Sequence, residues 1–142
     1  MLSTSRGVAP FVGLWLDQAG ATIVAVKHEG EPVVQHVESD VEGHYRLSGG
    51  WKSGTRTQAV ADEKRINRRR QHQLDRYYER LAEAVGDAGR VLILGPGEAK
   101  LGLKRALERR PGRRRRRMTV KTADRMTDRQ LVATVRRFFS GQ

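Results

Sequence analysis

The stretch "RVLILGPGEAKLGLKRAL", residues 90–107, decides the fold class of this 142-residue chain. An apolar run ends at Gly95-Pro96-Gly97, and a charged segment with helical periodicity follows directly. This order predicts a strand over 90–94, a tight turn, and a helix over about 97–109. Because a strand followed by a covering helix is the unit of a parallel sheet, part of the sheet is expected to be parallel.

The Gly-Pro-Gly turn does not carry the pattern of a nucleotide-binding loop. A Walker A loop needs a second glycine followed by Lys-Ser/Thr, and in a dinucleotide fingerprint Lys100 would have to be glycine. Glu98 is expected to satisfy the N–H groups of the helix that follows and to repel a phosphate. The turn is therefore expected to be structural, and no nucleotide cofactor is predicted.

The segments on either side complete one α/β domain over residues 11–139, after a flexible N-terminus at 1–10. Thr127 begins a capping box and so marks the start of the last helix. The order β-β-β-α-β-α-β-α predicts a mixed five-stranded, ribonuclease-H-like sheet, in which an antiparallel meander is joined to two parallel strands by right-handed crossovers. The other expected elements are strands over 11–17, 21–27, 32–38 and 118–122 and a long helix over 62–86.

The charge of the chain predicts a polyanionic partner. Lys and Arg number 28 against 16 Asp and Glu, a net charge of +12, and residues 51–142 carry +15 while residues 1–50 carry −3. Arginine dominates the excess, which favours contact with the phosphates of RNA or DNA over an anionic membrane surface. The chain has no cysteine, so disulfides and thiolate metal sites are excluded. No apolar run approaches a membrane span, and a cytoplasmic location is expected.

The long helix is expected to have one apolar and one basic face. Leu74, Tyr77, Tyr78, Leu81 and Val85 share a stripe, with Ile66 at its margin. Like charges spaced three or four residues apart destabilise an isolated helix, so a repeated basic stripe favours an anionic partner over a merely solvated face. The basic residues on nearly the opposite face are Arg65, Arg69, His72, Arg76 and Arg80, and the run of positive charge continues with Lys64 and Arg68.

Two further segments are candidates for RNA contact. Residues 39–61 form a long polar, glycine-rich loop, and its alternative interpretation is a disordered linker. Tyr45 and Trp51 in this loop can stack on unpaired bases. The arginine run at 113–117 can neutralise phosphates, or it is simply a soluble loop. The candidate residues here are Arg46, Gly49, Gly50, Trp51, Lys52, Arg56, Arg113, Arg114, Arg115, Arg116 and Arg117.

Two quoted segments carry a resemblance to a known family. "ADEKRINRRRQHQLDRYYERLAEAVGDAGRVLILGPGEAKLGLKRAL" (61–107) and "KTADRMTDRQLVATVRRFF" (121–139) resemble the middle domain of archaeal and eukaryotic class I peptide-chain release factors. Pelota, the stalled-ribosome rescue factor, shares that domain, and small bacterial release-factor-like (translational machinery) proteins are the most similar group. The resemblance covers about residues 11–139.

The resemblance implies a ribosome-associated protein that binds ribosomal RNA or tRNA on a ribonuclease-H-like scaffold without nuclease chemistry. In release factors the loop before the long helix carries a Gly-Gly-Gln tripeptide that promotes peptidyl-tRNA hydrolysis. Gly49 and Gly50 match this tripeptide, but Trp51 stands in the position of the glutamine. Pelota lacks the tripeptide and is the better analogue, so a non-catalytic role in rescue, hibernation or stress is expected, with no metal or cofactor.

Two alternatives stay open at this point. One is an enzyme, either a peptidyl-tRNA hydrolase with an altered loop or a metal-dependent nuclease. Such a nuclease would gather Asp17, Glu98, and Asp62 or Glu63 around its metal ions. The other alternative is a nonspecific nucleic-acid-binding protein with no role on the ribosome.

Overall fold

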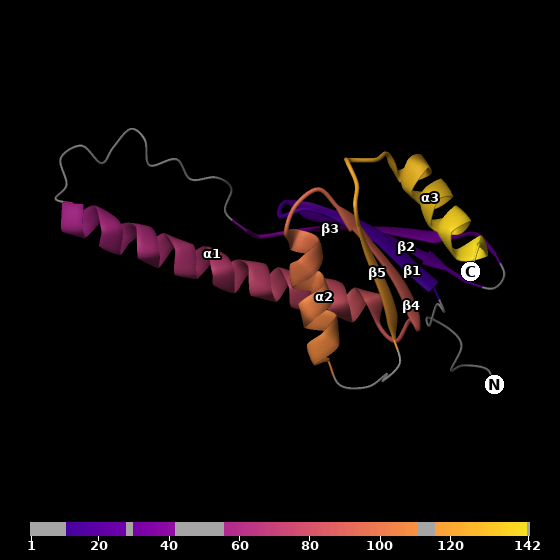
Figure 1. Ribbon diagram of the computed structural model, residues 1–142, viewed down its shortest axis with the longest axis horizontal. Coiled ribbons are helices and arrows are strands. Elements are labelled where there is room, and N and C mark those ends of the chain that lie inside the picture. Colours follow the sequence, from indigo (N-terminus) through magenta and orange to yellow (C-terminus); the bar gives the residue numbers. More distant parts are fainter. Residues whose placement is uncertain (1–10, 28–29, 42–55, 111–115, 142) are drawn as a thin grey trace.

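The computed structural model describes residues 11–27, 30–41, 56–110 and 116–141, which form one five-stranded sheet and three helices (Figure 1). The α/β class and the mixed sheet are as predicted. None of the described helices is both long and apolar enough to cross a membrane. The elements are β1 (Phe11–Leu16), β2 (Gly20–Val26), β3 (Val33–Glu38), α1 (Arg56–Val85), β4 (Arg90–Gly95), α2 (Ala99–Arg109), β5 (Arg117–Thr122) and α3 (Asp128–Ser140).

The strand order is β3-β2-β1-β4-β5, a ribonuclease-H-like arrangement. β1, β2 and β3 pair antiparallel in sequence order, which confirms the predicted meander. β4 pairs parallel with β1 and β5 pairs parallel with β4, so the strand before the Gly-Pro-Gly turn lies between two parallel neighbours. The apolar run at 91–94 is accordingly buried on both faces of the sheet.

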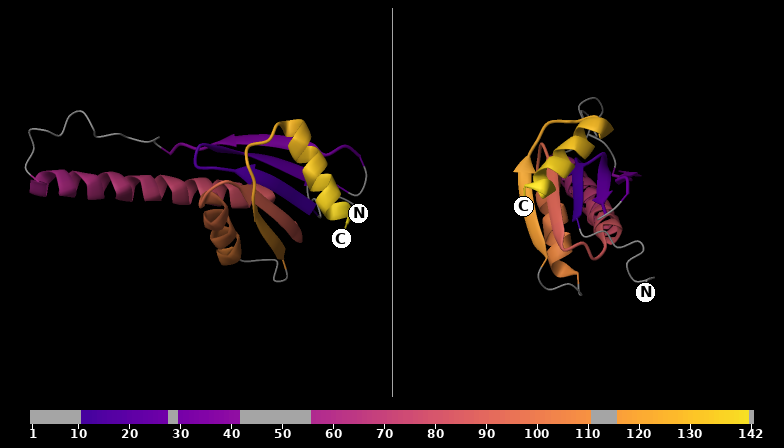
Figure 2. Two further views of the ribbon diagram at one scale, coloured as in Figure 1. Left: turned by 45° about the horizontal axis from the view of Figure 1, so that its top comes forward. Right: turned by 90° about the vertical axis from the view of Figure 1, so that its right-hand side faces the viewer.

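Helices cover both faces of the sheet (Figure 2). Leu14, Ile93 and their neighbours pack with α1 and α2 on one face. On the other face Trp15 and Leu92 pack with α3. A Cβ atom at Gly13 of β1 would collide with the side chain of Val135, so glycine at this position lets α3 lie close against the sheet.

Local sequence explains where two of the helices begin and end. The predicted capping box of α3 is present: Thr127 Oγ1 accepts from Gln130 N at 3.1 Å, and Gln130 Oε1 accepts from Thr127 N at 2.9 Å. α1 stops before Gly86, whose φ of 65° favours glycine. The start of α1 at Arg56 corrects the expected start at residue 62, so residues 56–61 of the predicted loop are helical.

The Gly-Pro-Gly turn is a close-packed connection. A Cβ at Gly95 would collide with the carbonyl oxygen of Leu16 on the neighbouring strand, whereas a Cβ at Gly97 would meet nothing within 4 Å. Lys100 Nζ donates to the carbonyl of Gly97 at 2.5 Å. The expectation for Glu98 was wrong in one respect, because this residue is the N-cap of α2 but its side chain makes no capping hydrogen bond.

Tyr77 predicts a pH dependence of stability. Its side chain is fully buried, and its hydroxyl donates to the carbonyl of Asp17 at 2.9 Å. Burial raises the pKa of Tyr77 well above the ordinary value of about 10. The fold therefore favours the neutral phenol, and the unfolded chain gives up its proton first as the pH rises above about 10. Stability should fall steeply from that pH upward.

Replacing Tyr77 by phenylalanine separates the ionisation from the packing. Tyr77→Phe should cost about 1 kcal/mol near neutral pH, because it removes one hydrogen bond. Above a pH of about 10 the variant should lose less stability than the wild type, as measured by urea unfolding at a series of pH values. Parallel curves for the two proteins would show that Tyr77 does not control the alkaline transition.

Candidate nucleic-acid interface

Helix α1 has two halves with different surroundings. Its C-terminal half supplies core residues, and the predicted apolar stripe of Leu74, Tyr77, Tyr78, Leu81 and Val85 is buried. Its N-terminal part extends beyond the sheet (Figure 1). We call residues 56–69 of α1 the arm; it is about 21 Å long at the normal rise of a helix.

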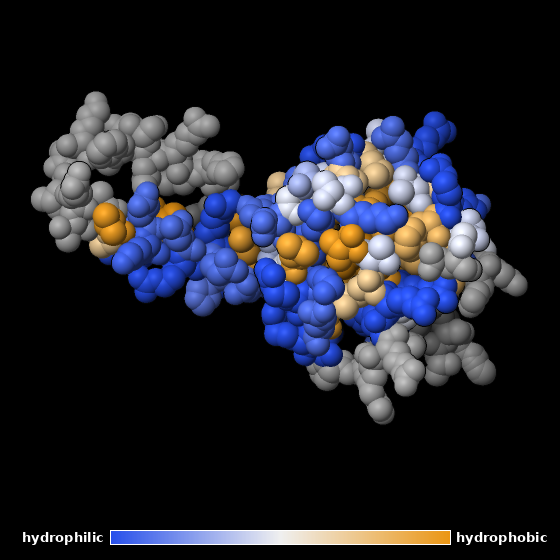
Figure 3. Space-filling model, viewed as in Figure 1, coloured by the Kyte–Doolittle hydropathy of each residue, from blue (hydrophilic) through white to orange (hydrophobic). Residues whose placement is uncertain are grey.

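The arm is polar and positively charged. It carries five basic residues against Asp62 and Glu63, a net charge of +3. We call the sheet and the helices packed on it the body of the protein. In the view of Figure 3 hydrophilic side chains cover most of the described part of α1 that projects from the body. A helix that is polar on most of its circumference gains little from burial, and the arm is held in place mainly by its continuity with the packed half of α1.

The predicted basic face lies on the side of α1 opposite the core. Arg65 approaches Asp62 at 3.8 Å, but both side chains are at least half exposed, and an ion pair of this kind contributes little. Among the hydrogen bonds and ion pairs of the described residues, none involves the side chains of Lys64, Arg68 or Arg76. The exposed members of this face are Arg65, Arg68, Arg69, His72 and Arg76, with the exposed Lys64 at its margin.

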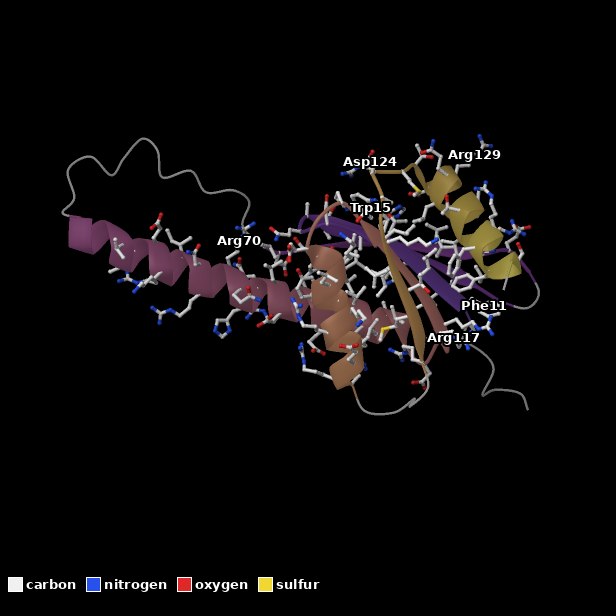
Figure 4. The ribbon with its side chains drawn as sticks, viewed as in Figure 1. Phe11, Trp15, Arg70, Arg117, Asp124 and Arg129 are labelled. Atoms are coloured by element: carbon white, nitrogen blue, oxygen red, sulfur yellow. The ribbon has the colours of Figure 1, made fainter. Side chains whose placement is uncertain are left out.

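Two arginines of α1 have structural contacts instead. Arg80 donates to the carbonyl of Glu38 at 3.0 Å and lies 3.9 Å from Asp40, so it ties α1 to the end of β3. Arg70 donates to Gln18 in the β1–β2 turn, at the point where α1 reaches the body (Figure 4). The basic face is therefore shorter than the predicted stripe, and it ends at Arg76.

The arginine run is divided by the structure. Arg116 is half-buried and donates to the carbonyls of Ala88 at 3.1 Å and Gly86 at 2.5 Å, a structural role that was not predicted. Arg117 is exposed at the start of β5. The other candidates lie outside the described residues, as does the side chain of Arg56: they are Arg46, Gly49, Gly50, Trp51, Lys52, Arg113, Arg114 and Arg115.

Two of the residues considered for a nuclease centre, Asp17 and Asp62, have other contacts. Asp17 Oδ1 accepts from the backbone N–H groups of Ala19 and Gly20, at 2.9 and 3.0 Å, and so stabilises the β1–β2 turn. Asp62 lies on the arm beside Arg65. Within the described part of the chain, no three His, Asp or Glu side chains lie together in a way that could hold a metal ion.

A hollow of about 510 Å³ opens where β1 ends, between the β1–β2 turn and the start of α3. The His36 ring and the Asp128 carboxylate lie in it, 2.8 Å apart and both more than half exposed. Trp15 forms one wall; its Nε1 donates to the carbonyls of Ala123 and Asp124, at 3.1 and 3.0 Å. These contacts fix the connection between β5 and α3 against the end of β1.

Sequence reasoning missed Arg90 and Lys121, two cations that lie beside aromatic rings on the α3 side of the sheet, where the predicted candidate Arg117 also lies. The Arg90 guanidinium lies 5.7 Å from the ring centre of Phe11, and Lys121 Nζ lies 5.2 Å from that of Phe138. The signal in the sequence was the alternation of Arg117, Thr119 and Lys121 with apolar residues, which places the three on one face of a strand.

Comparison with models of known protein families and with curated proteins finds no match for this chain.

Proposed function

We propose that this chain is a non-catalytic RNA-binding protein that contacts ribosomal RNA or tRNA through the basic face of α1. The observation that carries the proposal is the exposed row of Arg65, Arg68 and Arg76, aligned on the side of α1 that faces away from the core, with Lys64 at its margin. Phosphates of a nucleic acid would relieve the repulsion within this row and release counterions on binding.

The chemistry of the arm favours a structured RNA over an unpaired strand. Residues 56–69 contain no aromatic side chain, so the arm offers no platform on which bases could stack. Arginines fixed along a straight helix can instead contact the phosphates of a duplex, whose positions are also fixed. Folded RNAs such as ribosomal RNA and tRNA present such duplexes.

The ribosome as the site of action is supported by the resemblance to the release-factor middle domain and to Pelota. That resemblance includes Glu63, Lys64 and Arg65 of α1 and the turn after β4. A role in rescue, hibernation or stress, in the cytoplasm, is part of the same proposal. Trp51 in the position of the catalytic glutamine favours binding without hydrolysis.

Sedimentation of cell lysate through a sucrose gradient tests the ribosomal part of the proposal. The protein should travel with ribosomal fractions at about 50 mM salt and leave them by a few hundred millimolar, because several phosphate contacts give a steep salt dependence. A profile confined to the top of the gradient at low salt would contradict ribosome binding. Release of labelled peptide from peptidyl-tRNA would contradict the non-catalytic assignment.

A further inference from the structure

A second basic surface lies on the face of the sheet opposite to α1 and α2. Val91 and Ile93 of β4, with Met118 and Val120 of β5, pack toward α1 and α2. Because side chains alternate along a strand, the residues between them point to the α3 side. On β4 these are Arg90 and the buried Leu92 and Leu94, which pack with α3, and on β5 they are Arg117, Thr119 and Lys121. The basic surface consists of Arg90 and the three residues of β5, and the register places Arg90 directly beside Arg117.

This surface is accessible at the edge of the sheet. α3 packs over β1, where Val135 contacts Gly13 and Phe139 stacks on Phe11, and it also covers Val24 of β2 and Leu92 and Leu94 of β4. β5 is the last strand of the sheet, and the side chains of Arg117 and Lys121 are exposed. Figure 4 shows Phe11 and Arg117 at the same end of the sheet, near the C-terminal end of α3.

The cations of this surface have no anionic partner in the described part of the chain. None of its ion pairs involves Arg90, Arg117 or Lys121. Like charges placed directly opposite each other on neighbouring strands destabilise a sheet, and Arg90 and Arg117 are such a pair. An anionic ligand that bridges the two would remove this repulsion.

The shape and chemistry of the surface distinguish its ligand from that of the arm. Arg117 and Lys121 stand about 13 Å apart along β5, with the Thr119 hydroxyl between them. The half-buried ring of Phe138 lies at one margin, next to Lys121, and the ring of Phe11 lies next to Arg90. An open sheet face that combines cations with aromatic rings suits an unpaired strand, whose phosphates and bases are both available.

We propose that the α3 side of β5, together with Arg90 at the start of β4, binds a short single-stranded segment of RNA. Arg90, Arg117 and Lys121 contact its phosphates, and the aromatic margin at Phe138 contacts a base. This site is separate from the basic face of α1, since the sheet lies between them, and it would function even if α1 bound nothing. One molecule could then hold a duplex and an unpaired strand on opposite sides.

The test compares two labelled RNAs on the full chain, a single strand of about six nucleotides and a duplex of about 16 base pairs. Arg117→Gln with Lys121→Gln should weaken binding of the single strand about tenfold or more and change binding of the duplex by less than about threefold. The matched control is Arg129→Gln with Arg136→Gln, which removes the same charge from the flank of α3 opposite to Phe138. This control should leave binding of the single strand within about threefold.

Two outcomes of these binding measurements would overturn the proposal. One is unchanged binding of the single strand by the Arg117/Lys121 variant, and the other is an equal loss in the control, which would show an effect of net charge alone. Phe138→Leu supplies a second measurement, since it removes the ring without changing the charge. This substitution should weaken binding of the single strand by about threefold to tenfold. A thermal melt checks that the variant is folded. Full competition by inorganic phosphate at millimolar concentration would show a simple anion site and would also overturn the proposal.

Discussion

Replacing Arg65, Arg68 and Arg76 by glutamine should weaken binding of a structured RNA roughly 100-fold at about 0.1 M salt. The three guanidinium groups project from the same side of α1, and each is expected to neutralise one phosphate. Losing three phosphate contacts should also reduce the slope of log K against log salt by about 2 to 3. Titration of labelled tRNA at several salt concentrations measures both quantities.

The matched control removes three cations from α2. Lys104→Gln, Arg105→Gln and Arg109→Gln lower the net charge by the same amount, but Lys104 and Arg109 already pair with Glu108 and Glu79, at 3.0 and 3.6 Å. This variant should bind within about threefold of the wild type. The α1 variant should melt at the wild-type temperature or slightly above it, because it loses like-charge repulsion. Equal losses of affinity in the two variants would mean that net charge, rather than the face of α1, binds the RNA.

Gly95→Ala should lower the free energy of unfolding by about 3 kcal/mol. The added Cβ would collide with the carbonyl oxygen of Leu16, and neither group can move without disturbing the pairing of β1 with β4 at the centre of the sheet. An effect of this size is a large fraction of the stability of an ordinary domain. Urea denaturation, with the midpoint and slope fitted together, measures it.

Gly97→Ala, two residues later in the same turn, is the control. Nothing lies within 4 Å of the position of its Cβ, and its φ is not positive. This substitution should be neutral or should stabilise the protein by up to about 1 kcal/mol, because alanine restricts the unfolded chain. If both substitutions destabilised the protein equally, the close approach of Gly95 to Leu16 would not be the cause of the lost stability.

The sequence predicted the fold well because its patterns are local. The apolar run at 91–94, the capping box at Thr127 and the alternating strands at the start of the chain each specify one element within a few residues. The start of α1 was predicted too late because the sequence of residues 56–61, RTQAVA, has no apolar stripe of helical period that would mark it as helical. The positions of Gly13 and Gly95 against other elements could not be predicted, since their neighbours are distant in sequence.

The candidate interface was predictable only in part for the same reason. Helical spacing alone placed Arg65, Arg68 and Arg76 on one face. It could not show that Arg80 reaches the end of β3, or that Arg116 bonds to the chain before β4. Arg117 was predicted as part of the arginine run. The surface that it forms with Lys121 and Arg90 was missed, because Arg90 comes from another strand that only the parallel pairing brings alongside.

The continuity of α1 has a geometric consequence. One unbroken helix contains both the proposed RNA-binding residues and residues of the core. RNA bound to the arm would therefore have a fixed orientation relative to the sheet. Inserting one alanine between Arg69 and Arg70 would rotate the basic residues of the arm by about 100° about the helix axis relative to the sheet. Inserting seven residues would nearly restore their original direction and would lengthen α1 by about 10 Å. For a partner that contacts the arm and the sheet at once, affinity should therefore depend on the rotation that the insertion causes about the helix axis, and not simply on the length of the insertion.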